Sequence, residues 1–394
     1  MKHPLLSILA ALAITGCAGT LGPSPSATAM TTTAATAPSS NGNTFCLGRF
    51  LIDMPQGARL HGAGYKYDFA QIEKPKAMSL EQFNKVVNER EAQLKAVKHR
   101  VEPSLLRQTV RPNASSRILV FWEQDFTSAG VEIEGYRWID GTRFLVTDEA
   151  DTEKQALAVE RMEQIVSGLR PRTVSDIPTD PGYCFEGGFI ANERWKSGEE
   201  IDISFRFPDH PGAALVVQIY PLRASRRDPP LLDRVGGVMG AIGAVANRVQ
   251  VLRRGDKAVG GFKGQEYLVA GSDHPGKPGQ LFTWETQGEG TLQEPVIKIE
   301  LRTGKVDDKG NPQATRWSNE EAMAVWDRIL MSFKVRPVSS SEPKKTSDAG
   351  PSTPTSPVRA ATGEPCPASG EWDCSDHGNA MGSKALSGIE QSAA

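Results

Sequence analysis

The sequence predicts an α+β fold built from two similar units, each an antiparallel sheet with helices packed on one face. The first observation is a repeated opening, in which an aromatic residue and a cysteine precede a β-prone run at Phe45-Cys46 and Tyr183-Cys184. The second is a repeated closing helix, and the third is a shared order of strands and helices between the two. Such an order is typical of hairpins covered by helices. Chance similarity of two short patterns is the alternative.

The closing helices each carry four large apolar residues at positions 0, 3, 4 and 7, which places all four on one helix face. We therefore predict helices over 159–170 and 323–334, and Ser318 with Glu321 forms a capping box before the second. The apolar residues are Met162, Ile165, Val166 and Leu169 in the first helix and Trp326, Ile329, Leu330 and Phe333 in the second.

The interior of each unit is predicted from apolar alternation and from helical spacing. In the first unit, Ser79 and Gln82 form a capping box for a long helix that extends to about Arg100. In the second unit, residues 230–246 are helix-like. Strands are expected over 64–72, 117–122, 131–138 and 143–147 in the first unit and over 200–207, 213–220, 264–270, 281–285 and 296–301 in the second.

The N-terminus has the features of a bacterial lipoprotein signal. A basic start is followed by the apolar run Leu5–Ile14, which is shorter than the ~20 residues of a membrane-spanning helix. The run ends in Ile14-Thr15-Gly16-Cys17, which looks like a lipobox, so Cys17 is expected to be lipidated. An ordinary cleaved signal is the alternative. Because Ala18 and not Asp follows, we expect the periplasmic face of the outer membrane.

Composition divides the chain into six segments. Residues 1–16 are the expected signal peptide, 17–45 a lipidated flexible tether, 46–172 the N-terminal domain and 173–182 a linker. Residues 183–337 are the expected C-terminal domain. Residues 338–394, rich in Ser, Pro, Thr and Gly, are expected to be a disordered tail.

Charge and motifs exclude several classes of protein. The 45 Lys and Arg residues against 47 Asp and Glu give a net charge of -2, which argues against a nucleic-acid partner. The sequence has no Gly-x-Ser-x-Gly, P-loop, His-Glu-x-x-His or paired Cys-x-x-Cys motif. We therefore expect no catalytic residue, metal, cofactor or small-molecule substrate, and a protein that acts by binding.

The cysteines suit an oxidising compartment. With Cys17 lipidated, an even number remains, namely Cys46, Cys184, Cys366 and Cys374. Two disulfides are expected in the periplasm, with three possible pairings. Pairing Cys46 with Cys184, which would join the two openings, and Cys366 with Cys374 is the favoured hypothesis.

Three segments carry a resemblance to a known family. Phe45–Pro55 resembles the opening of the immunity proteins that neutralise type VI secretion lipase effectors of the fourth class. Tyr183–Ile190 resembles the opening of that family's C-terminal domain, and Trp326–Phe333 resembles its close. The resemblance covers residues 46–337, and the long C-terminal tail departs from the family pattern.

The resemblance implies a two-domain periplasmic inhibitor. Its domains would grip the lid region of a phospholipase effector like a claw and block the effector's active site. Charged loops of the second unit are the expected contacts, although solvated loops without a partner are the alternative. The contact residues would be Arg223, Arg226, Arg227 and Asp228 in one loop and Arg253, Arg254 and Asp256 in another.

Two other functions remain open from the sequence. One is a non-enzymatic envelope accessory or structural lipoprotein that binds a cell-wall enzyme or an assembly machine. The other is a hydrolase whose catalytic residues are scattered along the chain. A lipase gene with a Gly-x-Ser-x-Gly motif next to this gene would favour the immunity protein over the accessory lipoprotein.

Overall fold

The computed structural model describes residues 43–339, except 222–227, 243–248, 275, 290, 292 and 308. These residues belong to one compact unit of the chain. The expected signal peptide, the lipidation site Cys17, nearly all of the tether and all but the first residues of the tail lie outside them. Among the described helices, none has the length and apolar character needed to cross a membrane.

The first half of the described chain runs from β1 to β10. Its two helices are α1 (Leu80–Ala96) and α2 (Gln155–Gly168), with a short 3-10 turn at Thr152–Lys154 before α2. Ser79 and Gln82 form the predicted capping box at the start of α1. The strands are β1 (Asn43–Leu47), β2 (Phe50–Met54), β3 (Arg59–Tyr67), β4 (Ala70–Ile72), β5 (Lys76–Ala77), β6 (Leu106–Val110), β7 (Ser116–Trp122), β8 (Gly130–Ile139), β9 (Thr142–Asp151) and β10 (Leu169–Pro171).

The second half repeats this order from β11 to β19. Its helices are α3 (Leu231–Ile242) and α4 (Asn319–Ser332), and Ser318 with Glu321 caps α4 as predicted. The strands are β11 (Gly182–Phe185), β12 (Gly188–Ala191), β13 (Glu200–Arg206), β14 (Ala214–Tyr220), β15 (Gln250–Val259), β16 (Phe262–His274), β17 (Lys277–Glu285), β18 (Val296–Arg302) and β19 (Lys334–Val335). The predicted α+β class and the repeated order are both confirmed. The prediction that the helices share one face of each sheet is wrong, because α2 and α4 pack on one face and α1 and α3 pack on the other.

The strand order of the 13-stranded sheet is symmetric about its centre, so that equivalent strands of the two halves lie at equal distances from the middle. It runs β15-β16-β17-β18-β14-β13-β3-β4-β9-β8-β7-β6, with β5 paired to β9 off this path. Each strand on this path has its equivalent at the mirrored position in the other half, whereas β5 has none among the described strands. At the centre β3 pairs with β13, in a ladder that begins with Lys66 opposite Glu200. The two halves are thus related by a pseudo-twofold axis and share one continuous antiparallel sheet.

The opening hairpins are exchanged between the halves. The hairpin β1–β2 pairs with β19 and packs on α4, which both belong to the second half. Conversely, the hairpin β11–β12 pairs with β10 and packs on α2 of the first half. The two expected units are therefore not self-contained, because each one completes its small sheet with strands from the other.

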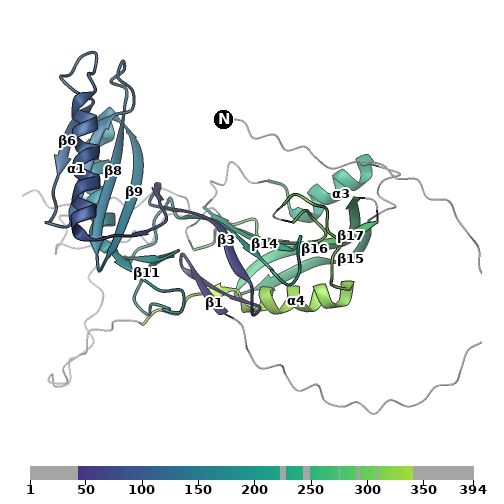
Figure 1. Ribbon diagram of the computed structural model, residues 1–394. Helices are drawn as coiled ribbons and strands as arrows, with labels where there is room; N and C mark the ends of the chain where they lie inside the picture. Colours follow the sequence, from purple (N-terminus) through teal and green to yellow (C-terminus); the bar gives the residue numbers. More distant parts are fainter. Residues whose placement is uncertain are drawn as a thin grey trace, which may run out of the picture. The chain divides into compact units, whose positions relative to one another are not determined.

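The main core lies on one face of the large sheet, under α2, α4 and the two small sheets. The predicted helix positions fill it, and Met162, Val166, Trp326 and Leu330 are all buried. Figure 1 shows α3 and α4 on opposite sides of the strands β15 to β17. A smaller core under α1 contains Phe83, Val87 and Leu94.

Three further sequence-based predictions need correction. The single strand over 64–72 is two strands, because Asp68 and Phe69 form a turn with φ of 52° and 74°. The helix predicted to reach Arg100 ends at Ala96. Residues 250–259, including Arg253, Arg254 and Asp256, form the strand β15 and not a charged loop. The strand β15 lies at the edge of the sheet. Charged side chains are common on edge strands, where they discourage pairing with another chain.

Candidate partner-binding face

The two faces of the large sheet are covered very differently. The main core covers one face along its whole length, whereas α1 packs on β6 to β8 and α3 on β16 at the two ends of the other. On β3, β13 and β14, at the centre of this second face, the side chains that point away from the main core keep solvent exposure. We call this surface the open face. Its residues are Gly62, Gly64 and Lys66 of β3, Glu200, Asp202, Ser204 and Arg206 of β13, and Ala214, Val216, Gln218 and Tyr220 of β14.

Strict alternation along β13 and β14 creates the open face. Ile201, Ile203 and Phe205 of β13 are buried in the main core, and the residues between them are not. The same alternation holds for β14. Because successive side chains of a strand point to opposite sides, one face is apolar and the other is free to carry polar groups.

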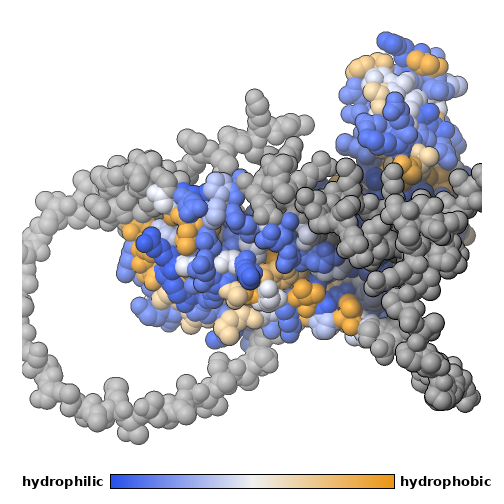
Figure 2. All heavy atoms as spheres, turned by 180° about the vertical axis from the view of Figure 1, so that it is seen from behind, coloured by the Kyte–Doolittle hydropathy of each residue, from blue (hydrophilic) through white to orange (hydrophobic). Residues whose placement is uncertain are grey.

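The middle of the open face is polar and has small side chains. Lys66 Nζ lies 2.9 Å from a carboxylate oxygen of Glu200, and Gln218 Nε2 donates to Asp202 at 3.1 Å. Gly64 is a neighbour of these residues on β3. Such a surface offers donors, acceptors and exchangeable ion pairs to a protein partner. Figure 2, which views the molecule from behind, shows scattered hydrophobic patches on a mainly hydrophilic described surface.

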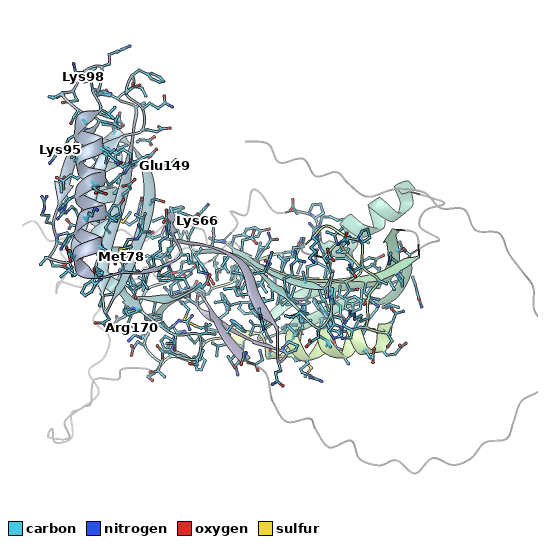
Figure 3. All side chains as sticks on the ribbon, viewed as in Figure 1. Lys66, Met78, Lys95, Lys98, Glu149 and Arg170 are labelled. Atoms are coloured by element: carbon cyan, nitrogen blue, oxygen red, sulfur yellow. A yellow bond between two sulfur atoms is a disulfide. The ribbon has the colours of Figure 1, made fainter. Side chains whose placement is uncertain are left out.

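The flank toward α1 is acidic. Glu132 of β8 lies directly opposite Glu149 of β9 in the strand ladder. Burial, followed by the charges of Glu149 and Glu134, raises the pKa of Glu132 above its ordinary value. Figure 3 shows Glu149 and Lys66 on the part of the sheet that lies between α1 and α3. Like charges that face each other on adjacent strands destabilise a sheet.

The flank toward α3 carries paired charges. Arg234 of α3 lies 2.6 Å from Glu285 of β17, and Lys298 lies 3.3 Å from Glu300 within β18. Arg302 also pairs with Glu300. The two flanks of the open face therefore differ in electrostatic character although they occupy equivalent positions.

A buried ion pair holds the junction beneath the open face. Arg49 in the first hairpin turn donates to Glu199 through Nε at 2.8 Å and Nη2 at 2.7 Å, and Nη2 also donates to the Arg194 carbonyl. Burial raises the pKa of Glu199, and the hydrogen bonds from Arg49 act against that rise. The pair ties the first hairpin to the loop before β13.

Equivalent arginines fix the two exchanged hairpins. Arg336 donates to the carbonyls of Asp180 and Gly182 at 2.8 Å, and its backbone N–H donates to the Arg49 carbonyl. Arg172, its counterpart, donates to the carbonyls of Phe185 and Asp176. Burial lowers the pKa of Arg336 to about 10, so its side chain is charged at neutral pH.

The predicted bond between Cys46 and Cys184 is present. The two cysteines occupy equivalent positions in the exchanged hairpins, their Cα atoms are 5.7 Å apart and both side chains are buried. Beside them, the backbones of Gly48 and Cys184 exchange two hydrogen bonds of 2.8 Å. Gly48 has a φ of 56°, and a Cβ there would come within 2.9 Å of the Tyr183 ring, so the position favours glycine. Cys366 and Cys374 lie outside the described residues.

Those predicted contact residues that the structure describes lie on different sides of the second half. Arg223, Arg226 and Arg227 lie outside the described residues, and Asp228 is exposed before α3. Arg253 instead points to the α4 side and pairs with Asp327 at 2.5 Å and Glu266 at 2.7 Å. The hydrogen bond to Asp327 raises the pKa of Arg253. Arg253 is thus placed to stabilise the packing of α4 on β15.

Arg254 and Asp256 lie on the α3 side of β15 and are exposed. Asp256 accepts a hydrogen bond from Gln265, whose side-chain oxygen in turn accepts from the Leu232 backbone N–H of α3. Asp256 and Gln265 line a groove of about 690 Å³ beside the start of α3. Arg254 and Asp256 are therefore accessible to a partner, although they lie on a strand and not on the predicted loop.

The described residues contain no group of three His, Cys, Asp or Glu side chains that could hold a metal ion. The open face itself was missed by sequence analysis. Alternation over 200–207 could have indicated which side chains share a face, but no sequence signal showed that helices would leave that face uncovered.

Comparison with known proteins agrees with this architecture. Two family models match, the N-terminal domain of Tle cognate immunity protein 4 over residues 43–177 and its C-terminal domain over residues 176–338. No match was found among curated proteins. The N-terminal and C-terminal models meet between α2 and β11, where the structural repeat also divides.

Solved structures give the same result. The apo structure of the immunity protein TplEi of the type VI secretion system from Pseudomonas aeruginosa is 28% identical, with a TM-score of 0.66 over 76% of this chain and 100% of that one. TplEi with an "L" peptide is 28% identical, with a TM-score of 0.63 over the same shares. In the crystal structure of the Tle4–Tli4 complex, the matching chain is 27% identical, with a TM-score of 0.67 over 77% of this chain and 100% of that one. The chain therefore belongs to the Tle cognate immunity protein 4 family and contains both of its domains.

Proposed function

We propose that this protein is an immunity protein that binds a lipase effector of the type VI secretion system and inhibits it by occupancy, without catalysis. The single observation that carries the proposal is the match of both family domains across residues 43–338. A similar chain was solved as the Tli4 component of a Tle4–Tli4 complex, which supports a lipase as the partner.

The open face is the surface we assign to this contact. It lies between α1 and α3, it is lined by polar and small side chains, and it is not needed for the main core. Its ion pair between Lys66 and Glu200 is exposed, so exchanging it for pairs with a partner costs little. A lipase bound to the open face would have its lid region covered by this protein, which would block access to the lipase active site.

Localisation is part of the same proposal. The segment Ile14-Thr15-Gly16-Cys17 would anchor the protein by lipids at Cys17, on the periplasmic face of the outer membrane. A tether raises the local concentration of the inhibitor at the membrane that a phospholipase attacks. Metabolic labelling with a palmitate analogue should modify the wild-type chain and not the Cys17→Ala variant. Equal labelling of both would refute lipidation at Cys17.

The binding proposal is tested with the purified full chain and any lipase that is found encoded beside its gene, also purified. We expect stoichiometric inhibition of phospholipid hydrolysis by the wild type. Asp202→Lys, which reverses a charge on the open face and removes the acceptor of the Gln218 hydrogen bond, should weaken inhibition at least tenfold. Met331→Lys, at a 78% exposed position on α4, is the matched control and should inhibit like wild type. No inhibition by the wild type would refute the function, and a larger loss with Met331→Lys would refute the assigned face.

A further inference from the structure

The turn between β3 and β4 has an unusual residue for its conformation. Asp68 and Phe69 form the whole turn and have φ of 52° and 74°. Two-residue hairpin turns with both φ values positive strongly favour glycine at the second position. A bulky aromatic residue with positive φ is an outlier, and such outliers persist where surrounding contacts impose them.

Contacts with the second half impose this conformation. The Phe69 backbone N–H donates to the Gly198 carbonyl at 3.2 Å, and Lys196 Nζ lies 3.2 Å from the Asp68 carboxylate. A Cβ on Gly198 would come within 2.1 Å of the Phe69 nitrogen and within 2.7 Å of the first ring atom, so the approach requires glycine at 198. The hydrogen bond and the ion pair do not use the Phe69 ring, so glycine at position 69 would keep both.

The Phe69 ring contributes little to the core. It is 56% exposed, and among the described residues its ring contact is the Arg161 guanidinium, 6.0 Å from the ring centre. In the equivalent connection of the second half, Phe207 is 5% exposed and packs edge-on against Trp317. The repeat therefore buries its aromatic residue in one half and exposes it in the other.

The surroundings of Phe69 suit a protein contact. Arg161 lies one helical turn from Leu157, which is 67% exposed on α2. Leu157 and Arg161 line a groove of about 430 Å³, and Glu149 lies on its wall. No ion pair is found for Glu149 within the described part of the chain. A few residues supply most of the binding energy of a protein interface, and aromatic residues and arginine are enriched in its core.

We propose that Phe69 is an anchor that inserts into an apolar pocket of the lipase effector, with a basic effector side chain meeting Glu149 at the rim. This inference rests on the proposed function and adds the residue that carries the largest share of the affinity. The strained turn presents the ring to the partner at a fixed position. Presentation by a rigid turn reduces the ordering cost of binding.

The test separates fold from binding because the backbone at position 69 favours glycine. In the full chain, Phe69→Gly should have a melting temperature equal to or above that of the wild type. Its Kd for the purified lipase encoded beside the gene should rise at least tenfold, measured by calorimetry. If Phe69→Gly lowers the melting temperature, Phe69→Asn, which also tolerates positive φ, takes its place with the same expected loss.

Phe126→Ala is the matched control, because Phe126 is a 60% exposed phenylalanine outside this turn. It should bind within twofold of the wild type. The anchor is refuted if Phe69→Gly binds within twofold of the wild type, or if Phe126→Ala loses as much affinity. A wild-type chain that does not bind the lipase refutes the proposed function instead. The wild-type titration therefore separates the two failures.

Discussion

Equivalent helices of the two halves bury equivalent residues on one side of the sheet but not on the other. On the main-core side, α2 and α4 bury the same positions, Met162 with Trp326 and Val166 with Leu330. On the other side the equivalents differ, because α1 is anchored by Phe83, Val87 and Leu94, whereas Leu231 is the buried anchor described for α3. The preserved side holds the fold, and the side that differs borders the open face.

The largest expected effect is the loss of a preserved core residue. Trp326→Ala should lower the free energy of unfolding by about 3–5 kcal/mol, and Met162→Ala by about 2–5 kcal/mol. Because the hairpins are exchanged, either variant should unfold both halves together. Urea unfolding followed by fluorescence and by far-ultraviolet dichroism measures this. A separate transition for one half would contradict a shared core.

Removing the bond between the exchanged hairpins comes next. The Cys46→Ser, Cys184→Ser double variant should lose about 2–4 kcal/mol, because the bond closes a long loop across the two halves. Urea unfolding of the oxidised and reduced wild type should differ by the same amount. If the double variant is as stable as the oxidised wild type, the bond does not stabilise the fold. Strand pairing, packing and the hydrogen bonds of Arg49 and Arg336 would then hold the hairpins without it.

A smaller difference should separate α1 from α3. Val87→Ala in α1 removes a fully buried side chain and should cost about 2 kcal/mol. Val235→Ala in α3 removes a partly buried one and should cost less than about 1 kcal/mol. Equal losses in the free energy of unfolding for the two variants would mean that α3 is anchored as firmly as α1, which would contradict the difference proposed between the two helices.

The smallest expected effect is a gain. Glu132→Gln should stabilise the protein by up to about 1 kcal/mol at pH 7, because it removes the like-charge pair with Glu149. The folded state raises the pKa of Glu132, so it binds this proton more tightly than the unfolded chain. The wild type therefore gains stability from this group as pH falls toward the ordinary glutamate pKa, and the advantage of the variant should shrink.

Urea unfolding at pH 7 and at pH 5 checks this sign. Glu160→Gln, at an exposed position of α2, is the control and should change stability little at either pH. An advantage of Glu132→Gln that grows as pH falls would contradict the assigned repulsion.

Much of the fold was predictable because the core positions follow simple periods. The apolar faces of α2 and α4 and the capping boxes at Ser79 and Ser318 follow from spacing and residue type. The bond from Cys46 to Cys184 is the favoured one of three pairings that the sequence leaves open. The strand β15 escaped prediction because its charges, such as Arg253, obscure the alternation. Arg253 belongs there because it pairs across to Asp327 of α4, a contact that no local pattern encodes.

The hairpin exchange and the open face could not be predicted, because both depend on long-range pairing. Nothing near Phe50 indicates that it pairs with Val335. The turn at Phe69 was hidden because a phenylalanine gives no turn signal, and its conformation comes from contacts with Gly198 and Lys196. All three features depend on contacts between residues that lie far apart in the sequence.

Hydroxyl-radical footprinting of the full chain, with and without the lipase encoded beside its gene, tests the central claim most directly, because it labels side chains and so distinguishes the two faces of one sheet. Tyr220 on the open face should be protected by the lipase, and Met331 on the outer side of α4 should react equally in both samples. Protection of Met331 with unchanged labelling of Tyr220 would contradict the assignment of the open face.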